Sequence, residues 1–179
     1  MLDLSTKFDE SWQGKLFWKD GTPRTTALEY QGLLMSPCCE AGELTCLSCH
    51  SMHHSDPNDQ LRFGDSLQLP VVQQNLACTQ CHDNYKSDEQ LQRHTRHAPQ
   101  TPGSLCYNCH MPWQAYSLLN RVRSRRISNP SAAVTDEFGI PNACNQCHVD
   151  KTLEWTQKSL ALWKGPTTDP SQRITATCR

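Results

Sequence analysis

Four copies of one short pattern hold most of the cysteine in this sequence. The pattern Cys-x-x-Cys-His occurs as CLSCH from Cys46 (motif 1), CTQCH from Cys78 (motif 2), CYNCH from Cys106 (motif 3) and CNQCH from Cys144 (motif 4). Two thiols three residues apart can form thioethers at the edge of a porphyrin, and the next imidazole can then bind the iron. The repeat therefore predicts four covalently bound haem c groups. The attachment residues are Cys46, Cys49, Cys78, Cys81, Cys106, Cys109, Cys144 and Cys147, and the proximal ligands are His50, His82, His110 and His148.

Two other thiol chemistries fit the pattern less well. Structural zinc also uses Cys-x-x-Cys pairs, but it does not require a histidine directly after every second cysteine. A thioredoxin-like redox pair is expected once, on a βαβ scaffold, rather than four times along an irregular chain. Because all four copies carry the histidine, haem attachment is favoured over both.

The four histidines outside the motifs are candidate distal ligands. Eight histidines would give each of four irons two imidazoles, and an iron closed by two protein ligands suits electron transfer rather than substrate chemistry. His53 follows His50 too closely to bind the same iron, so it is expected to reach a neighbouring haem. His94 and His97 could instead be solvent-exposed or form half of a zinc site. His54 is a possible distal ligand in this chain or in a neighbouring subunit, or a plain loop residue.

Composition indicates that side chains alone cannot build a large core. Only 36% of the 179 residues are hydrophobic and the mean hydropathy is -0.67. Four apolar macrocycles would supply the missing interior, so we expect the chain not to fold without them. The formal net charge of -1 gives no basic field for nucleic acid. No stretch approaches the roughly 18 apolar residues of a membrane span, and the first residues lack the apolar run of an export signal.

The elements that must position these ligands are expected to be short. The segments between motifs are rich in Pro, Ser, Asn and Gln, which predicts a mainly irregular, haem-nucleated multihaem cytochrome c fold with short α-helices and little or no β-sheet. Residues 150–164 predict a helix with Leu153, Leu160 and Trp163 on one face. The run LQLPVV resembles a strand, but Pro70 weakens that assignment.

Several runs around the motifs resemble a known family. EYQGLLMSPCCEAGELTCLSCHSMH, ACTQCH, HTRHAPQTPGSLCYNCHMP and GIPNACNQCHVDKTLEWT are similar to multihaem cytochromes c with doubled CXXCH motifs, a type often fused to tetratricopeptide repeats. The similarity covers about residues 28–165. It implies that His53, His94 and His97 are distal haem ligands. The family also tends to have a histidine in the run RVRSRRIS, where this chain has Arg125.

That departure leaves one haem without its expected distal ligand. The candidates that remain are His54, a methionine such as Met35 or Met111, a histidine of another chain, or water. An iron open to water would allow an enzymatic function.

Domain boundaries follow from the motifs. We expect an N-terminal extension over residues 1–37 that wraps the haem core, a tetrahaem domain over 38–165 and a C-terminal tail over 166–179. Three cysteines remain outside the motifs. An oxidising compartment would favour a disulfide between Cys178 and either Cys38 or Cys39, but a bridge to another subunit or reduced thiols are also open.

A basic run offers partners for the haem carboxylates. Guanidinium is the natural bidentate partner of a carboxylate, so the run could pair with propionates, although an ordinary solvated surface is the alternative. Its members are Arg121, Arg123, Arg125 and Arg126.

These features predict a tetrahaem c-type cytochrome that transfers electrons in the periplasm or outside the cell. The first cysteines lie 32, 28 and 38 residues apart, which is close enough for each haem to contact the next. It would act as a relay subunit, a shuttle or a polymerised extracellular wire. The expected partners are redox proteins, with self-assembly or membership of a larger complex possible. The alternative is a reductase of nitrite, hydroxylamine or a sulfur oxyanion with one open haem, although an electron carrier is favoured over an enzyme.

Overall fold

The structure, a computed structural model, consists of short helices joined by irregular segments. It describes residues 14–25, 28–40, 42, 44–50, 75–115 and 121–164. The α-helices are α2 (Glu29–Leu34), α3 (Pro37–Glu40), α5 (Leu76–Thr79), α6 (Asp88–Thr95), α7 (Cys106–His110), α8 (Ala132–Phe138) and α9 (Leu153–Lys164). The 3-10 helices are η2 (Cys46–Ser48), η4 (Asp83–Tyr85), η5 (Pro102–Ser104) and η6 (Cys144–Gln146).

Local capping explains where the longer helices begin and end. The Ser87 hydroxyl accepts a hydrogen bond from the amide of Gln90 at the start of α6. Ser131 caps α8 in the same way through Val134, and α8 ends at Gly139, whose φ of 74° lies in the left-handed region. These caps fix short helices that could not persist on helix propensity alone.

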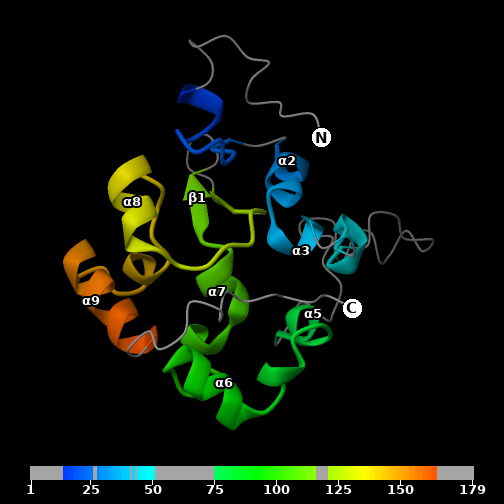
Figure 1. Cartoon of the computed structure of the whole chain (residues 1–179), viewed down its shortest axis with the longest axis vertical. Coiled ribbons are helices and arrows are strands. Elements are labelled where there is room, and N and C mark those ends of the chain that lie inside the picture. The colour runs from blue at the N-terminus through cyan, green and yellow to red at the C-terminus, as the bar shows by residue number, and fades with distance from the viewer. Residues whose placement is uncertain are drawn as a thin grey trace.

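A two-stranded antiparallel ribbon lies between motif 3 and α8. Strand β1 (Trp113–Ala115) pairs with β2 (Arg121–Arg123), so that Trp113 stands opposite Arg123 and Ala115 opposite Arg121. The sequence offered no alternating pattern here, because each strand has only three residues. The ribbon stands near the middle of the view in Figure 1.

The described part of the chain buries little apolar side chain. Its buried apolar residues are Phe17, Leu33, Leu91, Ala132, Ile140 and Ala143. The largest side chains that are almost completely inaccessible are Thr156, Ser36 and Ser104, which are small and polar. An interior of this kind agrees with the thin protein core expected from composition, and much of the space between elements is instead open as cavities.

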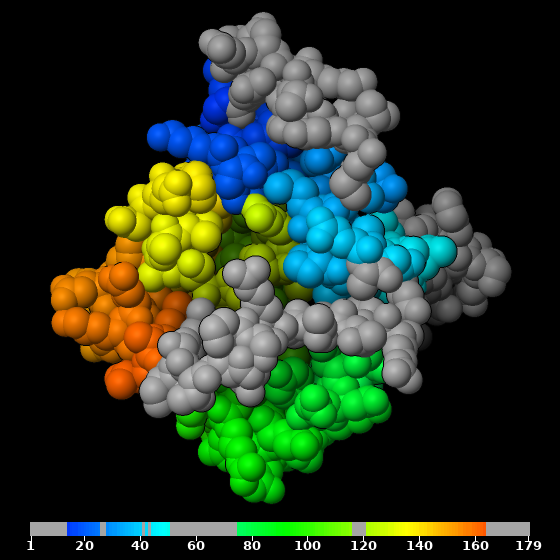
Figure 2. Space-filling view, in the orientation of Figure 1, coloured from blue at the N-terminus to red at the C-terminus, as the bar shows by residue number. Residues whose placement is uncertain are grey.

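The elements surround a centre that contains the ribbon and α7. In Figure 1, α8 and α9 lie on one side, α2 and α3 on the other, and α6 at the end opposite the N-terminal segment. Figure 2 shows the same arrangement in space-filling form, with the yellow and orange α8–α9 region separated from the light blue α2–α3 region. Helices α8 and α9 also contact each other directly.

The predicted fold class is confirmed: the chain is mainly helical and irregular, with one small ribbon among its described residues. The predicted helix over residues 150–164 is confirmed as α9. The run LQLPVV lies outside the described residues. Within the described part, no helix has the length and apolar character that a membrane crossing needs.

Candidate haem sites

Each motif folds into a tight turn that repeats the same hydrogen bond. The histidine amide donates to the carbonyl of the first cysteine at 2.9 Å in motif 1, 3.0 Å in motif 2 and 2.9 Å in motif 4. Motif 3 forms the short helix α7, which contains the same five residues. In a helical turn, positions i, i+3 and i+4 share one face, so both thiols and the imidazole of a motif can contact the same bound group.

Motif 4 opens onto a cavity of about 550 Å³. Cys144, Cys147 and His148 line one part of it, and His97 lines another. The ring centroids of His97 and His148 are 6.1 Å apart, with the ring planes at 41°. An iron between two imidazoles, with metal–nitrogen bonds of about 2 Å on each side, requires roughly this separation. The volume also falls in the usual range for cofactor pockets.

Neighbouring groups orient the His97 ring. Its Nδ1 hydrogen-bonds to the carbonyl oxygen of Thr95 at 2.5 Å, and a protonated Nδ1 would leave Nε2 free for a metal. Gly103 lies against the ring so closely that an added Cβ would overlap Cγ and Cδ2 of His97. The ring of Trp163 lies 6.5 Å from His97, measured between centroids.

Motif 3 faces His94 in a similar way. The ring centroids of His94 and His110 are 6.1 Å apart and their planes are parallel within 1°. The Nδ1 atom of His110 hydrogen-bonds to the carbonyl oxygen of Ser128 at 3.0 Å, which again leaves Nε2 available. Burial lowers the pKa of both His94 and His110, and nearby histidines lower it further, although the hydrogen bond to Ser128 partly opposes the shift at His110. The neutral form that binds metals is therefore favoured.

The end of α6 explains how two histidines three residues apart can serve different motifs. Residues at i and i+3 of a continuing helix would share a face. Here α6 ends at Thr95, and Arg96 adopts a left-handed conformation with φ of 56°. The chain turns at Arg96, so His94 faces His110 while His97 faces His148.

Motifs 1 and 2 share a second large cavity, of about 520 Å³. His50 and His82, the expected proximal ligands, both line it, together with Met111 and Arg125. Met35, the other methionine considered as a ligand, is the C-terminal cap of α2 and does not line this cavity. The expected ligands His53 and His54 lie outside the described residues.

Thiols of successive motifs lie next to one another. A hydrogen bond between the side chains of Cys78 and Cys106 raises the pKa of Cys78, and burial raises it further. Burial raises the pKa of Cys49, Cys78 adds to this, and the charge of Arg125 opposes it. Burial also raises the pKa of Cys109 to about 11, with motif 4 thiols adding to the shift. The motifs therefore follow one another in space in sequence order.

Two amide side chains connect neighbouring motifs. Asn75, three residues before Cys78 of motif 2, donates from Nδ2 to the carbonyl of Ser104 and accepts from the amide of Cys106, both at 2.8 Å. Gln146, inside motif 4, accepts from the amide of Trp113 at 2.9 Å and donates to its carbonyl at 2.7 Å. Each side chain thus binds two backbone groups beside motif 3. We call Asn75 and Gln146 the bridging amides.

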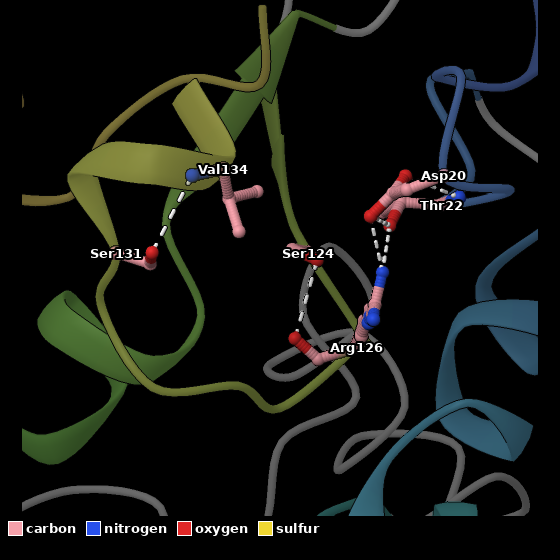
Figure 3. Close-up of polar contacts among 6 residues, drawn as sticks. All are labelled: Asp20, Thr22, Ser124, Arg126, Ser131 and Val134. Carbon is pink, nitrogen blue, oxygen red and sulfur yellow. Dashed lines mark hydrogen bonds and ion pairs between the residues drawn. The ribbon is translucent and has the colours of Figure 1, made fainter. Parts of the chain in front are cut away.

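All four arginines in the basic run contact other groups of the protein, and Arg125 does so through a long hydrogen bond of 3.4 Å to the carbonyl of Arg123. Arg126 pairs with Asp20 and donates to the Thr22 hydroxyl at 2.6 Å, as Figure 3 shows. Arg123 donates to the carbonyls of Tyr107 and Met111, at the end of α7. Arg123 also donates to the Asn108 side chain. The guanidinium groups of Arg123 and Arg121 both stack on the ring of Trp113. The expected pairing of this run with propionates stays a prediction, and Arg125 is the member that lines a large cavity without a carboxylate partner among the described residues.

The residues present fit a covalently attached porphyrin better than a zinc ion. Cysteines and the histidine of motifs 1, 2 and 4 border cavities of cofactor size, whereas Cys106 and His110 of motif 3 line neither cavity. Two of the candidate proximal histidines, His110 and His148, face a second imidazole at a spacing that suits one iron. In the described part of the chain, no three side chains of His, Cys, Asp or Glu gather as a metal site would require. Cys38 and Cys39 are half-buried free thiols in α3, and Cys178 lies outside the described residues.

Sequence reasoning missed several residues that shape the sites. The bridging amides gave no signal, because an amide inside or before a motif has no periodic partner. Ser128 and Gly103 were also missed, since their roles depend on contacts with His110 and His97 that only the fold creates. The left-handed residue Arg96 carries no sequence signature, because arginine rarely adopts that conformation.

Comparisons with known proteins point to the same cofactor. Residues 66–149, which contain motifs 2, 3 and 4, match the family described as cytochrome c7 and related cytochrome c. Among solved structures, the crystal structure of outer cell wall cytochrome OcwA is similar, with a TM-score of 0.50 and 18% identity. The alignment covers 86% of this chain but 41% of that one, so this chain spans less than half of that protein's length. No curated protein matches the chain. The repeated attachment motifs, the family match over residues 66–149 and the similar fold agree in pointing to a multihaem c-type cytochrome.

Proposed function

We propose that this multihaem cytochrome carries four haem c groups and relays electrons through them in the order of its motifs. Electron transfer is the function of the cytochrome class, whereas the number and order of the haems are our proposal. The observation that carries it is the adjacency of attachment thiols along the chain, with Cys78 against Cys106 and Cys109 beside motif 4. Porphyrins attached at neighbouring thiols must lie close to one another, which is the condition for fast transfer between them.

Each motif would hold its haem by two thioethers and one proximal imidazole. The proposed proximal ligands are His50, His82, His110 and His148. We assign His94 as the distal ligand opposite His110 and His97 as the distal ligand opposite His148, supported by the two centroid separations of 6.1 Å. His53, and His54 from this chain or a neighbour, are the proposed distal ligands for the other two irons.

The protein's own part in this function is to close and hold the sites. A bound haem iron supplies a one-electron couple between its ferric and ferrous states. The carbonyls of Thr95 and Ser128 would hold the rings of His97 and His110 in the orientation that presents Nε2 to the iron. The bridging amides hold the motifs at fixed spacing, so that the chain changes shape little when an electron passes.

We further propose a location in the periplasm or outside the cell. Haem c attachment takes place outside the cytoplasm, and the similar fold of a cytochrome named for the outer cell wall supports this setting. The partners would be redox proteins at either end of the haem series, within a larger complex or a polymer of the same chain. The division into residues 1–37, 38–165 and 166–179 remains part of the proposal.

The haem number can be tested on the purified holoprotein. We expect the intact mass to exceed the chain mass by four haem groups, and the pyridine haemochrome assay to give four haems per chain. Variants with both cysteines of one motif changed to serine should each lose one haem. A wild-type value of three or fewer would contradict the proposal.

A reductase with one open haem is the second candidate. The observation in its favour is Arg125, which lines the cavity of motifs 1 and 2. At this sequence position the family tends to have a histidine. A substrate oxyanion bound at an open iron there would change the Soret spectrum of the oxidised protein, whereas closed irons would not respond.

A further inference from the structure

The cavity shared by motifs 1 and 2 has a positive lining. Arg123 and Arg125 both line it, and no carboxylate does so in the described part of the chain. The remainder of the lining is largely apolar or belongs to the attachment motifs. A guanidinium beside an apolar cavity needs hydrogen-bonding partners, because an unpaired charge away from water is costly.

Arg125 has fewer hydrogen-bond partners among the described residues than Arg123 or Arg126. The guanidinium of Arg123 makes three hydrogen bonds, to Tyr107, Met111 and Asn108. Arg126 is paired with Asp20 and Thr22. The guanidinium of Arg125 donates one long hydrogen bond, of 3.4 Å, to the carbonyl of Arg123. Among the described residues, no carboxylate forms an ion pair with Arg125. Four of its five N–H donors thus remain for another acceptor.

The backbone of Arg125 is held close to helix α2. A Cβ added at Gly32 would lie 3.3 Å from Cβ of Arg125 and 3.2 Å from the amide nitrogen of Arg126. This approach is possible because Gly32 has no side chain. The packing fixes where the Arg125 side chain starts, beside a cavity that also contains Cys49 and His50.

We propose that Arg125 is the oxyanion-binding residue of this cavity and that its ligand is a propionate of a haem bound at motif 1 or motif 2. A guanidinium fork matches a carboxylate in two parallel hydrogen bonds. A haem in the cavity brings carboxylates with it, and the lining offers them no other unengaged guanidinium. The inference rests on the proposed function, because the haem is the source of the anion. A free oxyanion from solution has the same chemistry and is distinguished below.

The test compares two arginines of one segment in the holoprotein. Arg125→Gln removes the proposed partner, whereas Arg121→Gln removes an equal charge from an exposed residue that does not line the cavity. Spectroelectrochemical titration should show a lower midpoint potential for one or two haems in Arg125→Gln, because positive charge near an iron favours its reduced state. Arg121→Gln should leave all potentials close to wild type, since solvent screens its charge. Arg125→Lys should retain part of the effect, because it keeps the charge but not the fork.

Two further measurements separate the possible outcomes. Nitrite added to the oxidised wild-type protein tests for a free oxyanion: a spectral change that Arg125→Gln abolishes supports the oxyanion site but assigns its ligand to solution. Unshifted potentials in Arg125→Gln, with no nitrite response in wild type, would overturn the inference. Haem content is measured on every variant. Fewer than four haems in wild type would count against the proposed function, whereas a fully loaded Arg125→Gln protein with unshifted potentials would count against this inference alone.

Discussion

The structure places different residues opposite the candidate proximal histidines in two regions. The first region surrounds motifs 3 and 4, and the second surrounds motifs 1 and 2. In the first, each candidate proximal histidine faces a second imidazole at 6.1 Å between ring centroids, and the two distal candidates lie at and just after the end of α6. In the second, two proximal candidates share one cavity with a methionine and a half-buried arginine. In the first region the left-handed turn at Arg96 directs the two candidate distal ligands toward different motifs, whereas the described lining of the second cavity holds no histidine outside the motifs.

Removing a distal imidazole from the first region should have the largest effect. His97→Ala would leave the proposed iron at motif 4 with one protein ligand, so we expect CO binding to the reduced protein to rise to about one per chain, with a new high-spin signal. His94→Ala should do the same at motif 3. Equal CO binding in wild type and His97→Ala would exclude His97 as a ligand.

The contact between the two regions should be the next most sensitive feature. Asn75→Gly keeps the left-handed backbone at φ of 67° but removes both hydrogen bonds to the segment that begins motif 3. Leaving two backbone groups unpaired should cost about 1–3 kcal/mol each if they stay dry. Asn75→Asp, which retains the acceptor, should cost less. Chemical denaturation followed by the Soret band measures the difference, and identical curves for wild type and Asn75→Gly would refute the bridging role.

A substitution beside His97 tests the first region more gently. Gly103→Ala places a methyl group against the ring, and we expect a loss of about 1–3 kcal/mol with a spectral change confined to one haem. Gly14→Ala is the matched control, because an added Cβ there meets nothing within 4 Å. If the low-spin signals of Gly103→Ala are unchanged, the ring of His97 is not constrained as described.

Surface charge should matter least in either region. The pair between Lys158 and Glu154 on α9 is well exposed on both sides, so Lys158→Gln should change stability by about 0–1 kcal/mol and leave every potential unaltered. A larger loss of stability in thermal denaturation would mean that the exposed ion pair, rather than the packing of the cavity face, stabilises α9.

The sequence predicted the attachment chemistry because the motif is local: its five residues form their own turn. It also predicted α9, since a helical period is visible in twelve residues. Which motif His94 and His97 each face could not be predicted, because Arg96 adopts a rare backbone conformation between them. The contacts of the bridging amides could not be predicted either, nor could the position of Arg125 beside a cavity without a carboxylate partner. They depend on contacts between residues some 30 to 100 positions apart, such as Arg126 with Asp20.

Low-temperature EPR of the oxidised holoprotein, with CO added to the reduced form, tests the central claim most directly. A tetrahaem electron carrier with closed irons predicts only low-spin ferric signals, accounting for four haems, and no CO binding. A high-spin signal together with CO bound at about one per chain would contradict it. An open iron would then exist in wild type, and the reductase function would replace simple electron relay.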